Sequence, residues 1–388
     1  MPRILLNHLY YSPVGHVVEA IRYARGLYEG NPGSEIHVAL YEGAPAELCD
    51  GCPWIARTYR ISLDGREPGG ATEPPLPREW DYVVDNNLIR IETASPEQLD
   101  RPDGYVQELG WEEEAALAYY ERCEREQVVS GGRGVLYPRM VLPKGLGYVD
   151  DTHIDLEVPQ ESRAFAKRYE HDGPKICILP AGSAHAKLYP EAATWIAVIK
   201  ALGQRFPAAR FYLTGARNVA AHHTGTAAFG PEDIARIVGS SDRISDCYDI
   251  GLWHQAALLE QCDLLISPHS GFSFLAPCVG TPWLAISGGN WPEYFFNHVP
   301  FYSVLPDDPD YPYHGAVDGF EDGPRIKSME YRRLARRIPE IVNAAGFLLD
   351  PDTTYDEAAR RHRENVSHSR VRREHIPLAP TSRTEPAC

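Results

Sequence analysis

The sequence predicts an α/β protein with two Rossmann-like, doubly wound domains that face each other across a central cleft. Short apolar segments alternate with helical segments twice along the chain, and this alternation favours parallel sheets covered by helices on both faces. The length of 388 residues is too great for one ordinary core and suits two domains. Because ligands bind at the carboxyl ends of such strands, two sheets in tandem predict a shared cleft.

The first domain is expected to span residues 1–160. Its expected elements are, in order, a strand at 3–9, a helix at 14–30, a strand at 34–41, short apolar segments at 54–63 and 81–87, and a helix at 110–129. Acidic residues fill the first turn of that last helix, where the helix dipole favours them. The stretch 64–79 is rich in Pro and Gly, and residues 131–160 show no clear periodicity.

The second domain is expected to span residues 161–346. Its expected helices lie at 161–173, 190–206, 230–239, 251–262, 272–279 and 328–346, and its expected strands at 174–182, 209–215, 263–271 and 282–289. Pro190 stands at the first position of its helix, as is common at helix starts. The remaining residues, 347–388, form a polar, Arg-rich tail that is expected to be mobile or to wrap the domain.

Composition excludes several classes of partner. The net charge of −16 argues against nucleic acid, whose phosphates need clustered Lys and Arg, and against stable association with an anionic membrane. The chain has no apolar run long enough to span a membrane and no signal-peptide pattern, so a cytoplasmic location is expected. An anionic ligand must therefore be held by backbone amides and a few placed cations.

The eight cysteines are scattered. The pair Cys49 and Cys52 has the spacing of half a zinc knuckle or of a redox dithiol. No second pair follows at a suitable distance. Free thiols are therefore favoured over a zinc site and over a redox pair.

Three segments of the second half combine strands with small-residue loops. They are "ILPAGSAHAKLYPEAATW" at 178–195, "FYLTGARN" at 211–218 and "LLEQCDLLISPHSGFSFLAPCVGTPWLAISGGNWPE" at 258–293. In this order they resemble the donor domain of the heptosyltransferase-like glycosyltransferases of family 9, and the chain's opening resembles that family's first strand, loop and helix. The resemblance implies the GT-B fold, a nucleotide-sugar donor in the second domain and a role for Lys187 near the phosphates.

The loops themselves suit a pyrophosphate. Ser270, Gly271 and Phe272 can offer backbone amides at a helix start, where negative charge is stabilised as the nucleotide leaves. Asp249 is favoured over Asp246 for the ribose, with helix capping as the competing explanation. The expected donor-binding residues are Gly182, Ser183, Lys187, Thr214, Gly215, Asp249, His269, Ser270, Gly271 and Phe272.

Two positions depart from the family pattern. His269 stands where the signature loop usually has an acid, and Phe274 stands where the loop usually has a histidine. Both positions lie beside the expected donor. A UDP-, GDP- or dTDP-hexose is therefore as compatible with the sequence as ADP-heptose.

His16 is the candidate catalytic base. Its turn after the first strand points into the expected cleft, opposite the phosphates, and a histidine is suited to base chemistry at neutral pH. Family 9 usually has Asp here, whereas other inverting GT-B groups have a Gly-His pair like Gly15-His16. Gly15 and Glu19 are expected on the acceptor side, and Glu19 is either the residue that orients His16 or an exposed helix residue. His8 is the alternative base, although a packed strand histidine explains it better.

No metal and no cofactor besides the nucleotide-sugar co-substrate is expected. Acidic clusters at 149–155 and 306–310 resemble metal-binding sequences, but an acidic interdomain loop explains them better. The leading hypothesis is an inverting, metal-independent glycosyltransferase that acts on a hydroxyl or amine of a small soluble acceptor, as in antibiotic or other specialised-metabolite biosynthesis. The alternatives are a GT-B-fold nucleotide-sugar 2-epimerase and a non-catalytic protein that binds a nucleotide sugar.

Overall fold

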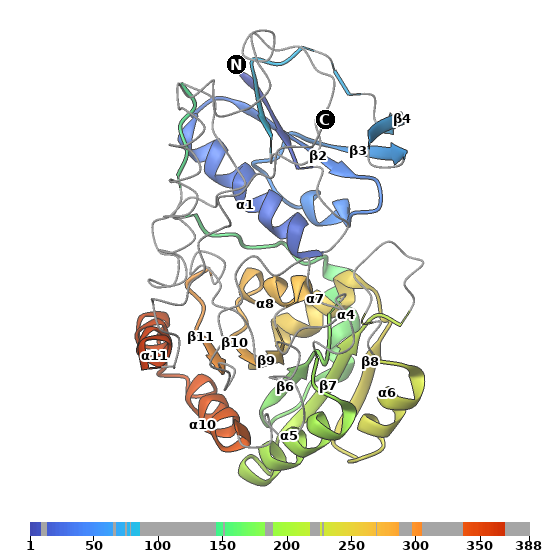
Figure 1. The fold of residues 1–388 in the computed structure, drawn as a ribbon, viewed down its shortest axis with the longest axis vertical. Coiled ribbons are helices and arrows are strands. Elements are labelled where there is room, and N and C mark those ends of the chain that lie inside the picture. Colours follow the sequence, from blue (N-terminus) through green and yellow to red (C-terminus); the bar gives the residue numbers. More distant parts are fainter. Residues whose placement is uncertain are drawn as a thin grey trace, which may run out of the picture.

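The computed structural model arranges two α/β units one above the other (Figure 1). It describes residues 1–8, 14–64, 67–73, 76–77, 79–85, 145–149, 152–182, 189–217, 226, 229–268, 270–286, 297–304 and 337–368. The helix expected at 110–129 lies outside these residues.

The N-terminal sheet has the order β4-β3-β2-β1-β5, in which only the edge strand β4 is antiparallel. Its strands are β1 (Arg3–Asn7), β2 (Glu35–Tyr41), β3 (Arg57–Asp64), β4 (Glu67–Glu73) and β5 (Tyr82–Asp85). The sequence predicted β1 and β2 as strands, and β3 and β5 lie in the two short apolar segments. It did not predict β4, because the residues "EPGGATE" have a composition typical of a loop. An edge position tolerates such residues.

Helix α1 (Val14–Gly30) occupies the range predicted for it, and a 3-10 helix, η1 (Ala46–Cys49), follows β2. Twelve of the 17 residues of α1 are buried, which is more than one apolar face provides. The helix lies between the N-terminal sheet and the C-terminal unit (Figure 1). One hydrophobic cluster runs from Ile4 and Val38 through Ile21 to Phe272 and Leu265, so the two units share a core.

The C-terminal sheet is fully parallel, with the order β11-β10-β9-β6-β7-β8. Its strands are β6 (Lys175–Ile178), β7 (Arg210–Gly215), β8 (Ile244–Tyr248), β9 (Leu264–Ser267), β10 (Trp283–Ile286) and β11 (Phe301–Val304). The strand order reverses between β6 and β9, which is the doubly wound arrangement predicted from the sequence. Ligands of such sheets bind at the carboxyl ends beside this reversal.

Helices cover both faces of this sheet, as Figure 1 shows. They are α4 (Gln160–Ala166), η3 (Lys167–Tyr169), α5 (Ala192–Arg205), α6 (Pro231–Val238), α7 (Leu252–Gln261), η6 (Gly271–Phe274), α8 (Leu275–Cys278), α10 (Ile338–Leu348) and α11 (Tyr355–His368). The helix predicted at 272–279 is thus a 3-10 turn followed by a short α-helix. Of the helix predicted at 328–346, the described part begins at Arg337 and continues to Leu348.

The C-terminal tail is helical over part of its length. Helix α11 packs beside β11 (Figure 1), with Ala358 and His362 buried. His362 contacts the ring of Phe301, and Asn365 Nδ2 donates to the carbonyl of Ser303 at 2.9 Å. Of the two expectations for the tail, wrapping is therefore the correct one for residues 355–368.

The linker at 152–159 is bonded to both units. Arg22 of α1 donates to the carbonyl of Thr152 at 2.6 Å. The side-chain amide of Asn297 accepts from the Ile154 N–H at 2.6 Å and donates to the Ile154 carbonyl at 2.8 Å. The Leu156 N–H donates to the carbonyl of Cys278 at 2.9 Å. The linker is thus bonded to α1 at Thr152 and to the C-terminal unit at Ile154 and Leu156.

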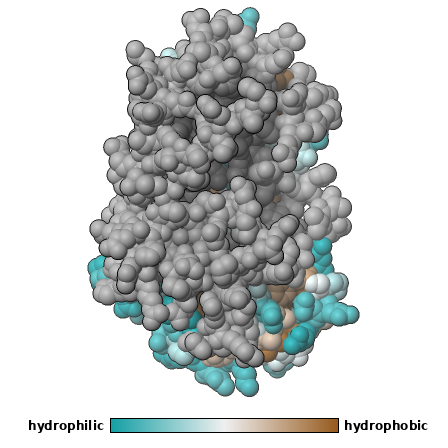
Figure 2. Space-filling model, in the orientation of Figure 1, coloured by the Kyte–Doolittle hydropathy of each residue, from teal (hydrophilic) through white to brown (hydrophobic). Residues whose placement is uncertain are grey.

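The described surface is mainly polar. On the face shown in Figure 2, the described residues are mostly hydrophilic, with a smaller apolar area among them. The large hydrophobic side chains that are exposed in the described part of the chain are Met1, Tyr28 and Val149. Within the same part, no helix combines the length and the apolar character that crossing a membrane requires.

Candidate active site between the two units

A cavity of about 450 Å³ opens at the carboxyl ends of the C-terminal strands. Five predicted donor residues line it, and its apolar walls include Leu179, Ala181 and Leu252. Val14, at the start of α1, contributes to the wall from the N-terminal unit. A cavity of this size and character suits a small-molecule ligand. The predicted residues that line it are Gly182, Gly215, Asp249, Ser270 and Phe272.

Buried hydroxyl groups stiffen the loop after β9. The Ser267 and Ser273 hydroxyls lie 2.7 Å apart, and Ser270 Oγ lies 3.3 Å from Ser273 Oγ. The indole N–H of Trp283 donates to Ser267 Oγ at 2.8 Å. The chain of bonds positions Ser270 at the cavity wall without using the backbone amides of Gly271 and Phe272.

Gly182 is required by close packing. A Cβ at this position would stand 2.7 Å from Ser270 Cβ and 2.7 Å from the Tyr189 hydroxyl. The absence of a side chain lets the loop after β6 approach the loop after β9, so both small-residue loops border one cavity.

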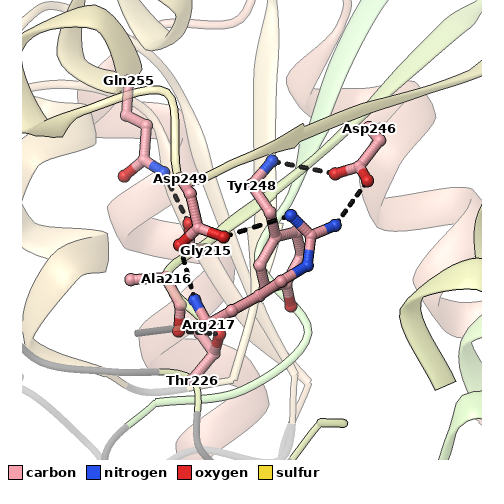
Figure 3. Close-up of polar contacts among 8 residues, drawn as sticks. All are labelled: Gly215, Ala216, Arg217, Thr226, Asp246, Tyr248, Asp249 and Gln255. Carbon is pink, nitrogen blue, oxygen red and sulfur yellow. Dashed lines mark hydrogen bonds and ion pairs between the residues drawn. The ribbon is translucent and has the colours of Figure 1, made fainter. Parts of the chain in front are cut away.

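Arg217 ties together the two aspartates considered for the ribose (Figure 3). Its guanidinium donates to Asp249 Oδ2 at 3.1 Å and to Asp246 Oδ2, and its backbone N–H donates to Asp249 Oδ1 at 2.7 Å. Its guanidinium also lies over the ring of Tyr248, 4.9 Å from the centroid. Burial opposes the charge of Arg217, but these two carboxylates outweigh it and raise the pKa of Arg217.

Asp249 does not cap a helix. The residue before α7 is Gly251, and no side-chain bond caps that helix. Asp249 instead adopts a left-handed backbone conformation, φ 57°, and faces the cavity. The competing explanation from the sequence is therefore wrong for this residue, and Asp249 is held at the cavity wall by Arg217.

Of the neighbouring residues Thr214 and Gly215, only Gly215 lines the cavity. The carbonyl of Gly215 accepts a bond from Gln255 Nε2 at 2.7 Å, and Gly215 and Gln255 both line the cavity (Figure 3). Thr214 is buried inside β7 and does not line it. Gly271 also lies outside the lining, although its neighbours Ser270 and Phe272 belong to it.

His16 and Glu19 form a pair on the first turns of α1. His16 Nδ1 lies 3.3 Å from Glu19 Oε2, and the Tyr23 hydroxyl donates to Glu19 Oε1 at 3.0 Å. Glu19 is buried, so the exposed-residue interpretation is wrong, whereas a quarter of the His16 side chain is exposed. Burial alone would raise the pKa of Glu19, but His16 and His8 outweigh it and hold that pKa well below its usual range.

The start of α1 touches the loop after β9. A Cβ on Gly15 would stand 2.5 Å from the Cα of Gly271 and 3.0 Å from the ring of Phe274. Gly15 is therefore a packing residue between the two units. Because His16 follows Gly15 in the chain, this contact places His16 next to the loop that borders the cavity.

Some predictions fall on residues that are not described, namely Ser183, Lys187, His269 and the cluster at 306–310. Of the cluster at 149–155, residues 150 and 151 are also outside the description. In the described part of the chain, the residues whose ligand atoms lie close enough to hold a metal ion are His8, His16 and Glu19.

Cys49 and Cys52 are buried and free. Burial raises the pKa of Cys49 well above its usual range and that of Cys52 to about 12. Both thiols stay protonated at neutral pH, which disfavours metal binding and thiol exchange.

A family model described as glycosyltransferase family 9 (heptosyltransferase) matches residues 106–297. This range contains every C-terminal residue that lines the cavity. The resemblance to glycosyltransferase family 9 is confirmed. No curated protein sequence matches the chain.

Solved structures resemble the chain at low sequence identity. A family 9 glycosyltransferase from Veillonella parvula DSM 2008 is 16% identical, with a TM-score of 0.57 over 90% of this chain and 97% of that one. The iron-containing dodecameric heptosyltransferase TibC, from enterotoxigenic E. coli H10407, in complex with ADP-D-β-D-heptose, is 14% identical, with a TM-score of 0.50 over 89% and 77%. E. coli ADP-heptose LPS heptosyltransferase II is 12% identical, with a TM-score of 0.49 over 89% and 100%. The first of these likenesses confirms the predicted GT-B fold.

Arg217 is a site residue that the sequence did not predict. It follows the end of β7 by two residues, at the same sheet edge as Gly215. A charged residue at the carboxyl end of a parallel strand was the available signal.

Proposed function

We propose that this protein is an inverting, metal-independent glycosyltransferase that moves a sugar from a nucleotide sugar to a hydroxyl or amine. The observation that carries the proposal is the contact of Gly15 with Gly271. It brings the His16–Glu19 pair of one unit to the cavity loop of the other. A base and a phosphate-binding loop on opposite sides of one site are what inverting transfer requires.

On the donor side, the loops after β6 and β9 receive the pyrophosphate. The amides of Gly271 and Phe272, the Ser270 hydroxyl and the Lys187 ammonium stabilise the negative charge that develops on the leaving oxygen. Gly182, Ser183 and His269 complete these two loops. Asp249, held by Arg217, accepts hydrogen bonds from the ribose, beside Thr214 and Gly215 at the end of β7.

On the acceptor side, His16 is the catalytic base. Its Nδ1–H donates to Glu19, which leaves Nε2 free of a proton and able to accept one. As the acceptor oxygen or nitrogen attacks the anomeric carbon, its proton passes to Nε2. The bond from the anomeric carbon to the phosphate oxygen breaks, and the nucleoside diphosphate leaves on the opposite face, with inversion.

We propose a small soluble acceptor, such as an intermediate of antibiotic or other specialised metabolism, and a cytoplasmic location. The net charge of −16 supports this choice, because it repels nucleic acid and anionic membrane surfaces.

The test has two stages. Thermal unfolding of the full chain with ADP, UDP, GDP and dTDP identifies the nucleotide, since a ligand that binds the folded state raises the unfolding midpoint. Release of that nucleotide from matching donors is then measured in the presence of a panel of small hydroxyl and amine acceptors. The proteins compared are the wild type, His16→Ala and His153→Ala, which changes an exposed histidine of the linker. We expect His16→Ala to keep nucleotide binding and lose turnover, and His153→Ala to keep both. Unchanged turnover in His16→Ala would refute the mechanism.

A further inference from the structure

We propose that His8, His16 and Glu19 form a binding site for a divalent transition metal ion such as Zn²⁺. The ligand atoms are His8 Nε2, His16 Nδ1 and Glu19 Oε2. The ion is not needed for transfer, and it inhibits transfer by occupying His16. The binding site stands on its own geometry, whereas the inhibition rests on the proposed function.

The two separations that involve Glu19 are close to those around a tetrahedral ion. Glu19 Oε2 lies 3.3 Å from His16 Nδ1 and 3.5 Å from His8 Nε2. One ligand atom from each of the three residues lies within 4.8 Å of the others. Zinc bonds to nitrogen and oxygen are about 2.0–2.1 Å long, so adjacent ligands of a tetrahedral zinc ion lie roughly 3.3–3.4 Å apart. Two imidazoles and one carboxylate are also a common donor set for such ions.

His8 provides the independent observation. It is 97% buried, its exposed fraction being 3%, and neither of its ring nitrogens has a hydrogen-bond partner. Its Nε2 faces Glu19 Oε2 at 3.5 Å, too far for an ordinary hydrogen bond. A buried polar atom without a partner costs free energy, and a metal ion bound to Nε2 would remove that cost.

The surrounding residues hold the ligands in place. The Tyr23 hydroxyl donates to Glu19 Oε1 at 3.0 Å, which orients the carboxylate and leaves Oε2 toward the two histidines. The Tyr23 ring also packs edge-on against the His8 ring, with 5.9 Å between centroids. Such contacts orient metal ligands and increase affinity.

The electrostatics favour a cation. Glu19 is buried, and the ion-pair partners that the described residues supply to it are two histidines, with no Lys or Arg among them. A quarter of the His16 side chain is exposed, so solvent reaches one side of the site and can supply the fourth ligand. This combination is typical of a metal site with an open position.

Metal binding and base chemistry compete for one atom. When the ion takes His16 Nδ1, the remaining proton of the neutral ring lies on Nε2. Nε2 then has no lone pair available for the acceptor proton. Bound metal therefore stops transfer without blocking the cavity that receives the nucleotide.

The direct test uses cobalt as a spectroscopic probe. The untagged full chain, stripped with a chelator, is titrated with Co²⁺ without substrates, and binding is followed by visible absorbance and by displacement with Zn²⁺. We expect one Co²⁺ per chain with an absorbance typical of a site with fewer than six ligands. His8→Gln should weaken binding at least about tenfold, since changes to outer residues alone cost ~10–100-fold. His37→Gln, a change at another buried histidine of the N-terminal unit, should leave binding unchanged.

Tyr23→Phe is the second variant, in case His8→Gln fails to fold, and it should weaken Co²⁺ binding while keeping all three ligands. No Co²⁺ binding by the wild type, or equal binding by wild type and both variants, would overturn the site. In the activity assay, Zn²⁺ should inhibit the wild type and inhibit His8→Gln at least about tenfold less strongly. Loss of turnover on chelation would overturn the inhibitory role. Co²⁺ binding is measured without substrates, so this test of the metal site gives a clear result even if the proposed function is wrong.

Discussion

Gly15 and Gly271 meet without side chains between them, one at the start of α1 and the other at the start of η6. A Cβ on Gly15 would stand 2.5 Å from the Cα of Gly271, closer than real Cβ atoms approach. The two units are thus joined by backbone contact beside the candidate base.

The first prediction concerns this contact. Gly15→Ala should push α1 away from η6, lowering the free energy of unfolding by about 1–3 kcal/mol through overpacking. Turnover should fall on the order of 10- to 100-fold, because the base is displaced from the donor loop. The measurements are urea unfolding and nucleotide release.

Gly346→Ala is the matched control for this change. Gly346 is also helical, but a Cβ there would meet only the Phe206 ring at an ordinary 3.6 Å. This change should stabilise the protein by up to about 1 kcal/mol and leave turnover unchanged. Equal effects of the two substitutions would mean that the contact has no special role.

The second prediction concerns Arg217. Arg217→Ala should weaken donor binding roughly tenfold, about 1.4 kcal/mol, because Asp249 loses the group that holds it at the cavity wall. The unfolding midpoint should change little, since partly exposed ion pairs contribute little stability. Calorimetric titration with the nucleotide measures the affinity.

Arg163→Ala is the control, because Arg163 makes a similar two-bond pair with Glu260, at 2.8 Å for both bonds, outside the cavity lining. Its donor affinity should equal that of the wild type. An unchanged affinity in Arg217→Ala would remove Arg217 and Asp249 from the donor site.

The third prediction is a dependence of stability on pH. Burial lowers the pKa of His37 below 6.5, where the ring contacts Tyr59 and Trp80. The unfolded chain therefore binds the proton more readily than the folded chain. The stabilisation is present above about pH 6.5 and is lost as the pH falls below that value.

The measurement is urea unfolding at pH 7.5 and pH 5.5 for the wild type and for His37→Phe. Phenylalanine keeps a ring beside Tyr59 and Trp80 but cannot titrate, so the loss of stability between the two pH values should be smaller in the variant. If both proteins lost the same amount of stability between the two pH values, groups other than His37 would be responsible.

The fourth prediction concerns α11. Ala358 is fully buried in the cluster that covers one face of the C-terminal sheet. Ala358→Asp should lower the free energy of unfolding by at least about 2 kcal/mol, because it buries a charge without a partner. Arg360→Asp introduces the same side chain at an exposed position of the same helix, and its effect should be much smaller.

The sequence predicted those helices and strands whose apolar pattern and flanking Pro or Gly residues indicate the same element. The range of α1 follows from Pro13 before it and Gly30 at its end. Strands β8 and β11 were not predicted, because β8 carries Asp246 and β11 carries Ser303 among their apolar residues. Their pairing with β7 and β10 supplies the stabilisation that their own sequences lack.

The site was predictable where a residue acts through its own loop and not where it acts through a distant partner. Ser270 and Gly182 were predicted from small-residue loops at strand ends, and both line the cavity. Arg217 was missed because its partners lie 29 and 32 residues further along the chain. The burial of Glu19 likewise depends on the fold, which brings His8 of the preceding segment against α1.

The contacts of α1 couple His16 to the junction between the two units. The helix that carries His16 also contacts η6 through Gly15 and holds the linker through Arg22. A movement of α1 that separated Gly15 from Gly271 would therefore withdraw His16 together with the helix. Under the proposed mechanism, a donor bound in the open state meets no activated nucleophile, and its sugar is protected from wasteful loss to water until the acceptor is enclosed with it.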